Sequence, residues 1–194
     1  MRLFLLGFLL TLISCGKATE EEKSAMPRPK GYPAMDIPKH SYQSLEKGHP
    51  FSFEISRQAI VKKDSFAFAE PHWMYIYYPR WDAFIQLTYK SVGGDRKRLD
   101  KMIRDSYVLA SKHQMKANRI EDAILTTRDG RKATIIELEG EVATPFQFFA
   151  TDSSTHFLRG AVYLNTALKN DSLAPVIRYI KQDALHLIQT LQWK

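Results

Sequence analysis

Residues 73–90 read WMYIYYPRWDAFIQLTYK, and this stretch decides the fold that the sequence predicts. It contains two runs rich in aromatic and β-branched residues, Trp73–Tyr78 and Ala83–Tyr89, and strands favour these residue types. The four residues between the runs, 79–82, include a proline and an aspartate, which are typical of a turn. The stretch therefore predicts a β-hairpin of two antiparallel strands.

Both faces of the first hairpin strand are apolar, because successive residues of a strand point to opposite faces. Those on one face are Trp73, Tyr75 and Tyr77, and those on the other are Met74, Ile76 and Tyr78. Either the hairpin is covered on both faces inside the core, or one aromatic face is exposed for a partner. The sequence alone leaves both alternatives open.

Further strands and two helices surround the hairpin in the sequence. Apolar runs and alternating patterns predict strands at Phe51–Ile55, Ile120–Thr126, Ala133–Val142, Pro145–Thr151 and His156–Leu164. Helical spacing predicts one helix from the N-cap Asp95 to about residue 117, with an apolar stripe of Leu99, Met102, Ile103, Ser106, Ala110, His113 and Ala117. A second helix is predicted to begin at Asp171 or Ser172, with Pro175 in its first turn, and to continue towards the C-terminus.

The order of these elements is strands, helix, strands, helix. Most consecutive strands have no helix between them, and this favours an antiparallel sheet over a parallel one. We therefore expect an α+β fold, in which a single domain has a central antiparallel sheet flanked by two long helices.

The first residues of the chain predict an exported lipoprotein. Residues 3–13 are mostly apolar, which is too short for a transmembrane helix of about 20 residues but suits a signal peptide. Residues 12–16, LISCG, resemble the bacterial lipobox, in which an aliphatic and a small residue precede a cysteine that receives diacylglycerol. We expect a signal peptide at 1–14, a lipidated flexible tether at 15–30 and a globular domain at 31–194, with Cys15 as the site of lipidation.

The composition excludes several classes of function. The formal net charge is +7, but lysines and arginines are scattered among acidic residues without a basic block, so we expect no nucleic-acid partner. Cys15 is the only cysteine, so the folded domain has no disulfide, no cysteine nucleophile and no thiolate metal site. The six histidines have no metal-binding spacing, and we expect no metal and no cofactor.

Residues 151–156, TDSSTH, place an acid, hydroxyls and an imidazole close together. A hydrolase that uses His156 with Ser153 or Ser154 is one alternative, but neighbours on a tight turn rarely face one another as a triad requires. We interpret the stretch as a turn between two strands, with Asp152, Ser153, Ser154 and His156 at its tip as candidates for partner contact. Arg159, in an otherwise apolar strand, either pairs with a carboxylate inside the fold or reaches a partner.

Several segments together resemble one known family. They are PRPKGYPAMDIPKHSY (27–42), YIYYPRWDAFIQLTYK (75–90), DSYVLASKHQMKANRI (105–120), QFFATDSSTHFLRGAVYLN (147–165) and DSLAPVIRYIKQD (171–183). In this order they resemble the gliding-motility lipoprotein GldD family of Bacteroidota. The order of strands and helices is also similar to the Mog1/PsbP-like sandwich, which is an analogy of fold.

The resemblance implies an envelope lipoprotein that is required for gliding and for the associated type 9 protein secretion machinery. Its partners would be other gliding and secretion proteins of the envelope, and the membrane would be reached through the lipid on Cys15, on the periplasmic side of the outer membrane. The family provides no established catalytic residues, so no enzymatic activity is expected. The alternatives are a periplasmic hydrolase and a small-ligand or lipid binder, which would have a cavity of about 300 Å³ or more.

Overall fold

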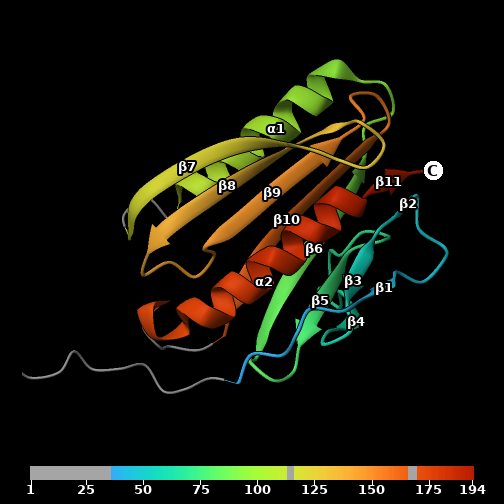
Figure 1. Ribbon diagram of the computed structural model, residues 1–194. Helices are drawn as coiled ribbons and strands as arrows, with labels where there is room; N and C mark the ends of the chain where they lie inside the picture. The colour runs from blue at the N-terminus through green and yellow to red at the C-terminus, as the bar shows by residue number, and fades with distance from the viewer. Residues whose placement is uncertain (1–35, 113–115, 166–169) are drawn as a thin grey trace, which may run out of the picture. The chain divides into compact units, whose positions relative to one another are not determined.

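Seven antiparallel strands form the main sheet of the protein (Figure 1). In pairing order they are β4 (Ile60–Lys63), β5 (Met74–Tyr78), β6 (Ala83–Ser91), β10 (His156–Leu164), β9 (Phe146–Thr151), β8 (Lys132–Gly140) and β7 (Ala117–Thr126). The computed structural model describes residues 36–112, 116–165 and 170–194. The predicted hairpin is confirmed as β5–β6, and the strand next to it, β10, lies at the centre of the sheet.

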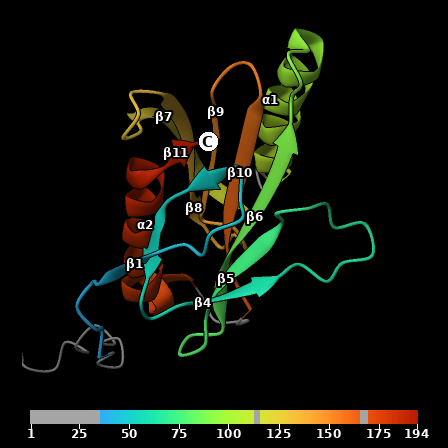
Figure 2. The ribbon, with the colours of Figure 1, turned by 90° about the vertical axis from the view of Figure 1, so that its right-hand side faces the viewer.

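One helix covers each face of this sheet (Figure 2), which confirms the predicted α+β fold. α1 (Arg96–Ser111) lies on one face, and α2 (Asn170–Thr190) lies on the other. The predicted N-cap of α1 is confirmed, because Oδ1 of Asp95 accepts hydrogen bonds from the backbone N–H groups of Lys97 and Arg98 at 2.9 and 3.1 Å. None of the helices within the described residues is long and apolar enough to cross a membrane.

The face towards α2 forms the larger hydrophobic core. Alternate residues of the strands point to it, so that Ile76, Ile85 and Leu158 are each at most 1% exposed. The apolar stripe of α2, with Val176, Ile180, Ala184, Leu187 and Ile188, closes this core together with Leu191, which directly follows the helix. Since burial contributes about 25 cal/mol per Å² of apolar surface, this face is the main source of stability.

The opposite face is covered over only part of its width. α1 packs there against β8, β9 and β10 through a second cluster that includes Leu99, Ile136, Phe149 and Phe157. Beyond α1, the side chains of β5 and β6 on this face, among them Tyr75, are half-buried. One face of the hairpin is therefore core and the other is partly open beside α1, so the hairpin is not fully covered on both faces. That the open face serves a partner stays a prediction.

The predicted strand Phe51–Ile55 is divided in the structure. β2 (Phe51–Ser52) pairs with β11 (Gln192–Trp193), and β3 (Glu54–Ser56) pairs with β1 (Tyr42–Ser44), so neither half joins the main sheet. Phe51, Phe53 and Ile55 are buried as their alternation predicts, with at most 5% exposed. The prediction of one strand was wrong because the backbone changes its pairing partner at Phe53.

Both helices differ from the sequence prediction at one end. α1 ends at Ser111, so Ala117 belongs to β7 instead of the helical stripe, and His113 lies outside the described residues. α2 begins at Asn170, which places Pro175 inside the helix, beyond its first turn. Proline removes one backbone donor there, and the packing of the following turns against the sheet compensates for this loss.

Candidate functional site

The turn between β9 and β10 contains the acid, the hydroxyls and the imidazole that the sequence singled out. Oδ1 of Asp152 accepts hydrogen bonds from the backbone N–H groups of Ser154, Thr155 and His156 at 3.0, 2.8 and 2.8 Å. The Ser154 hydroxyl donates to Oδ2 at 3.1 Å. Burial raises the pKa of Asp152, but these hydrogen bonds outweigh burial and hold the pKa at about 2. The carboxylate therefore stabilises the turn.

A hydrolytic triad does not form at this turn. His156 is 9% exposed, and its Nδ1 shares a hydrogen bond of 2.8 Å with the hydroxyl of Tyr89. Its ring stacks on Trp193 with a centroid distance of 5.1 Å. Among the residues that the structure describes, no serine hydroxyl forms a hydrogen bond with His156, although a triad requires one.

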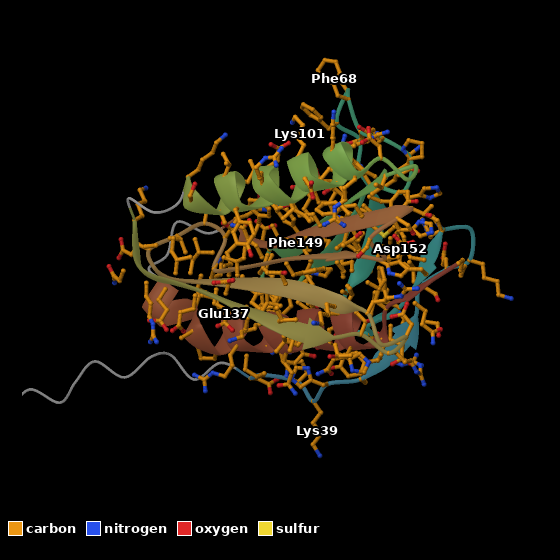
Figure 3. All side chains as sticks on the ribbon, turned by 90° about the horizontal axis from the view of Figure 1, so that it is seen from above. Lys39, Phe68, Lys101, Glu137, Phe149 and Asp152 are labelled. Atoms are coloured by element: carbon orange, nitrogen blue, oxygen red, sulfur yellow. The ribbon has the colours of Figure 1, made fainter. Side chains whose placement is uncertain are left out.

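The five predicted contact residues do not share one surface. Asp152, Ser153 and Ser154 lie at the turn, which Figure 3 marks by Asp152. His156 begins β10 and points into the core on the α2 side, so its predicted place at the loop tip is wrong. Arg159 follows three residues later and therefore points to the opposite, α1 side. The role of these residues in partner contact stays a prediction.

Arg159 is half-buried and pairs with a neutral group. Its Nη2 donates to Oε1 of Gln147 at 2.6 Å, and Gln147 is itself 2% exposed. Within the described part of the chain no carboxylate forms an ion pair with Arg159, so the alternative of an internal ion pair is wrong. Burial lowers the pKa of Arg159, but a guanidinium remains charged at neutral pH.

A cavity of about 370 Å³ opens between α1 and the side of β6 and β10 that faces this helix. Four cationic side chains and one carboxylate line it: Lys90, Arg98, Lys101, Arg159 and Asp105. Apolar groups complete the wall: Trp73, Met102, Leu109 and Phe157. The volume is within the range of small-ligand sites, which are mostly apolar with a few polar groups.

A loop next to this cavity presents two exposed aromatic rings. Phe66 and Phe68, in the β4–β5 connection, are 63% and 79% exposed, and their ring centroids lie 5.6 Å apart. Asp64, which is 3% exposed, accepts the backbone N–H of Phe66 at 2.9 Å. Glu70 forms an ion pair with Lys90 of β6. Figure 3 shows Phe68 on the side of the molecule opposite Lys39. The loop is thus held by hydrogen bonds and an ion pair while its two phenylalanines face solvent.

A buried polar network that the sequence did not reveal joins the N-terminal segment to α2. Asp183, which is 3% exposed, binds Nδ1 of His40 at 2.7 Å and accepts the hydroxyl of Tyr78 at 3.0 Å. The ring of His40 stacks on Tyr179 at a centroid distance of 4.1 Å. Burial and then the charge of Asp183 raise the pKa of Tyr78 well above its usual value. These contacts fix the residues before β1 against α2.

The histidines are spread over the molecule. Nδ1 of His49 and Nδ1 of His72 lie 3.1 Å apart, and His186 binds Glu54 at 2.7 Å. Burial and then the charge of His72 lower the pKa of His49. Among the described residues, no three histidine, cysteine, aspartate or glutamate side chains come together as a group that could hold a metal ion.

Sequence reasoning singled out Arg159 but missed Arg98, the other arginine of the cavity, and the exposed Phe66 and Phe68 of the β4–β5 connection. Phe66 and Phe68 stand in a stretch without strand or helix periodicity, between Asp64 and Pro71, and two phenylalanines in such a stretch are a signal of exposure. Arg98 gives no such signal, because an arginine in the first turn of a helix is normally solvated.

Comparisons with known proteins give a matching family and similar solved structures. The model of the family described as gliding motility lipoprotein GldD matches residues 22–193. Among solved structures, the solution structure of cyanobacterial PsbP (CyanoP) from Synechocystis sp. PCC 6803 is similar, with 12% identity and a TM-score of 0.49. This similarity covers 84% of this chain and 98% of that chain, and it concerns the fold alone. No curated protein matches the chain.

Proposed function

The chain belongs to the gliding motility lipoprotein GldD family, and we propose that it is a non-enzymatic assembly component of the gliding and type 9 secretion apparatus. Membership of this family makes it a gliding-motility-associated lipoprotein of the cell envelope. Contact with other envelope proteins, rather than turnover of a substrate, is the proposed activity. A hydrolase is not favoured, because within the described residues no serine hydroxyl of the β9–β10 turn forms a hydrogen bond with the imidazole of His156.

The proposed anchor is the lipid on Cys15. Removal of residues 1–14 and acylation of Cys15 leave residues 15–30 as a tether to the periplasmic side of the outer membrane. Each buried acyl CH₂ contributes about 0.8 kcal/mol, so the two or three chains of a bacterial lipoprotein hold the protein firmly. Mass spectrometry of the mature N-terminus and separation of the two membranes test this anchor. An unmodified N-terminus at another residue would contradict it.

The exposed phenylalanine pair is the observation that carries the proposed contact with a protein partner. Burial of a phenylalanine side chain contributes about 1.5–3 kcal/mol, and aromatic side chains dominate the binding energy of many protein interfaces. Asp64 and Glu70 hold the loop, so Phe66 and Phe68 lose little conformational entropy on binding. The occupant that we propose is an envelope protein of the gliding apparatus.

The experiment combines a double variant with crosslinking in cells. Phe66→Ser/Phe68→Ser removes the exposed rings, whereas Val108→Ser/Ile124→Ser removes two apolar side chains of comparable exposure elsewhere on the surface. We expect the first variant to reach normal levels and to melt normally but to lose gliding, and the second to glide.

A photoreactive residue at position 68 identifies the occupant. We expect it to crosslink to an envelope protein whose loss also stops gliding. Normal gliding of Phe66→Ser/Phe68→Ser, or a crosslink only to lipid or to a second copy of the chain, would contradict the proposal. A second photoreactive residue at position 153 tests the predicted contact role of Asp152, Ser153 and Ser154 in the same way.

A further inference from the structure

Two guanidinium groups at the cavity under α1 have no carboxylate partner within the described residues. The other charged groups of this cavity are compensated: Nζ of Lys101 lies 2.6 Å from Asp105, and Lys90 pairs with Glu70. Arg98 uses its backbone N–H to bind the Asp95 cap, and its side chain forms no ion pair with the residues that the structure describes. Among the same residues, the side-chain hydrogen bond of Arg159 goes to the neutral Gln147. Two positive charges therefore remain at one cavity.

The position of Arg159 makes this uncompensated charge significant. A half-buried charge normally has a counter-ion, because removal from water without one is costly. Arg159 lines the cavity, and its hydrogen-bond partner within the fold, Gln147, is neutral and buried, so the cavity is where an external counter-ion can meet this guanidinium. A guanidinium presents several N–H donors in a planar fork, and this fork matches the oxygens of a carboxylate or a phosphate.

The remaining wall of the cavity is apolar and aromatic. The indole of Trp73 is fixed by a hydrogen bond of 2.8 Å from its Nε1 to the backbone oxygen of Tyr89. Met102 and Leu109 of α1 and Phe157 of β10 add to the same wall. A ligand that fills this space needs a charged end for the arginines and an apolar body for these groups.

We propose that this cavity binds a small amphiphilic oxyanion, in which a carboxylate or a phosphate is attached to an apolar group. Arg98 and Arg159 bind the oxyanion, and the apolar body packs against Trp73 and Met102. This site goes beyond the proposed function and does not depend on the docking of Phe66 and Phe68. It is also one form of the small-ligand alternative that the sequence left open.

Titration calorimetry tests the site. It measures the binding of simple probes to the full acylated chain in lipid nanodiscs. The probes are 3-phenylpropionate and phenyl phosphate, and empty nanodiscs provide the blank. We expect at least one of the two to bind saturably, and the tighter one identifies the type of head group. The amide 3-phenylpropanamide and inorganic phosphate each lack one half of the ligand, so each should bind about tenfold more weakly or worse.

Three variants locate the binding. Arg98 is exposed, so Arg98→Gln should fold normally and weaken binding by about tenfold or more, as the loss of a charge-assisted hydrogen bond does. Arg104→Gln removes a positive charge from an exposed position of α1 outside the cavity and should bind like the wild type. Arg159→Lys keeps the charge but loses the planar fork, so it should also bind more weakly.

Several outcomes would overturn the site. The site is refuted if neither anion binds, or if Arg98→Gln and Arg104→Gln have equal effects on binding. It is also refuted if 3-phenylpropionate binds no tighter than its amide, or phenyl phosphate no tighter than inorganic phosphate. Crosslinking from position 68 should be unchanged in Arg98→Gln. Failure of the oxyanion site and failure of the proposed partner contact are therefore distinguishable.

Discussion

Replacement of Asp152 measures how much one turn contributes to the stability of the protein. Its carboxylate accepts three backbone N–H groups and one hydroxyl, and its pKa is about 2 in the folded protein against 3.8 as the ordinary value. Taken at face value this difference is about 2.5 kcal/mol, and solvent screening at a partly exposed turn lowers the contribution to about 1.5 kcal/mol.

Two substitutions separate the charge of Asp152 from its hydrogen bonds. Asp152→Asn keeps an acceptor oxygen but loses the charge, so it should cost about 1.5 kcal/mol and lower the Tm by about 3–6 °C. Asp152→Ala also leaves the N–H of His156 unpaired in a buried position, which raises the loss to about 3 kcal/mol. Ser154 and Thr155 are exposed, so their N–H groups can bind water instead.

The pH dependence gives the decisive comparison. Because the folded pKa of Asp152 is below the unfolded one, its contribution is fully present above about pH 4 and is lost as the pH falls towards 2. Urea unfolding at pH 7, 4 and 2.5 should show the difference between wild type and Asp152→Asn shrinking at the lowest pH. Glu139→Gln, at an exposed position, is the control. Equal stability of wild type and Asp152→Asn at pH 7, or a difference at pH 2.5 as large as that at pH 7, would refute the reasoning.

Three further predictions concern the core and its acid sensitivity. Gly160→Ala should destabilise by about 1–3 kcal/mol or more in urea unfolding, because the new Cβ would lie 2.2 Å from the ring of Phe148; a melting curve like that of the wild type would mean that this ring can move aside. Asp183→Leu should lower the unfolding free energy by about 2 kcal/mol or more, since it leaves the hydroxyl of Tyr78 without its partner, and an unchanged Tm would contradict this. Burial and the neighbouring imidazole lower the pKa of His49, so the unfolded chain takes up the proton more readily and stability should fall as the pH drops below 6.5. His49→Gln should flatten this part of the pH profile, and a profile equally steep in the variant would show that another group is responsible.

The sequence predicts those elements whose pattern is local. The hairpin, β8–β10 and the N-cap Asp95 follow from alternation, turn residues and capping chemistry, all of which act within a few residues. β1, β4 and β11 have three, four and two residues, which is too short for an alternating pattern to mark them in the sequence. Phe51–Ile55 shows the same limit, because its burial was predictable from alternation while its change of pairing partner was not.

The residues of the candidate site also fall into two groups: those whose role follows from a local sequence pattern, and those whose role depends on how the elements pack. The role of Asp152 in a turn is local and was predicted. The separation of His156 from Arg159 was also within reach of the sequence, since residues three apart in a strand point to opposite faces. The meeting of Arg98 with Arg159 was not, because it depends on where α1 packs across the sheet.

The uneven covering of the sheet explains why these functional candidates lie on one side. α2 and the two small sheets close the α2 side with aromatic and aliphatic contacts, and its residues on β5, β6 and β10 are almost fully buried. α1 lies over the β8–β10 side of this face (Figure 2). The residues of β5 and β6 beside it are half-buried, and they combine the aromatic rings of Tyr75 and Phe84 with the polar side chains of Gln86, Thr88 and Lys90. The cavity lies over this less covered part of the sheet, and its Arg98 and Arg159 have no carboxylate partner among the described residues. The loop with Phe66 and Phe68 is joined to the same region by the ion pair of Glu70 with Lys90.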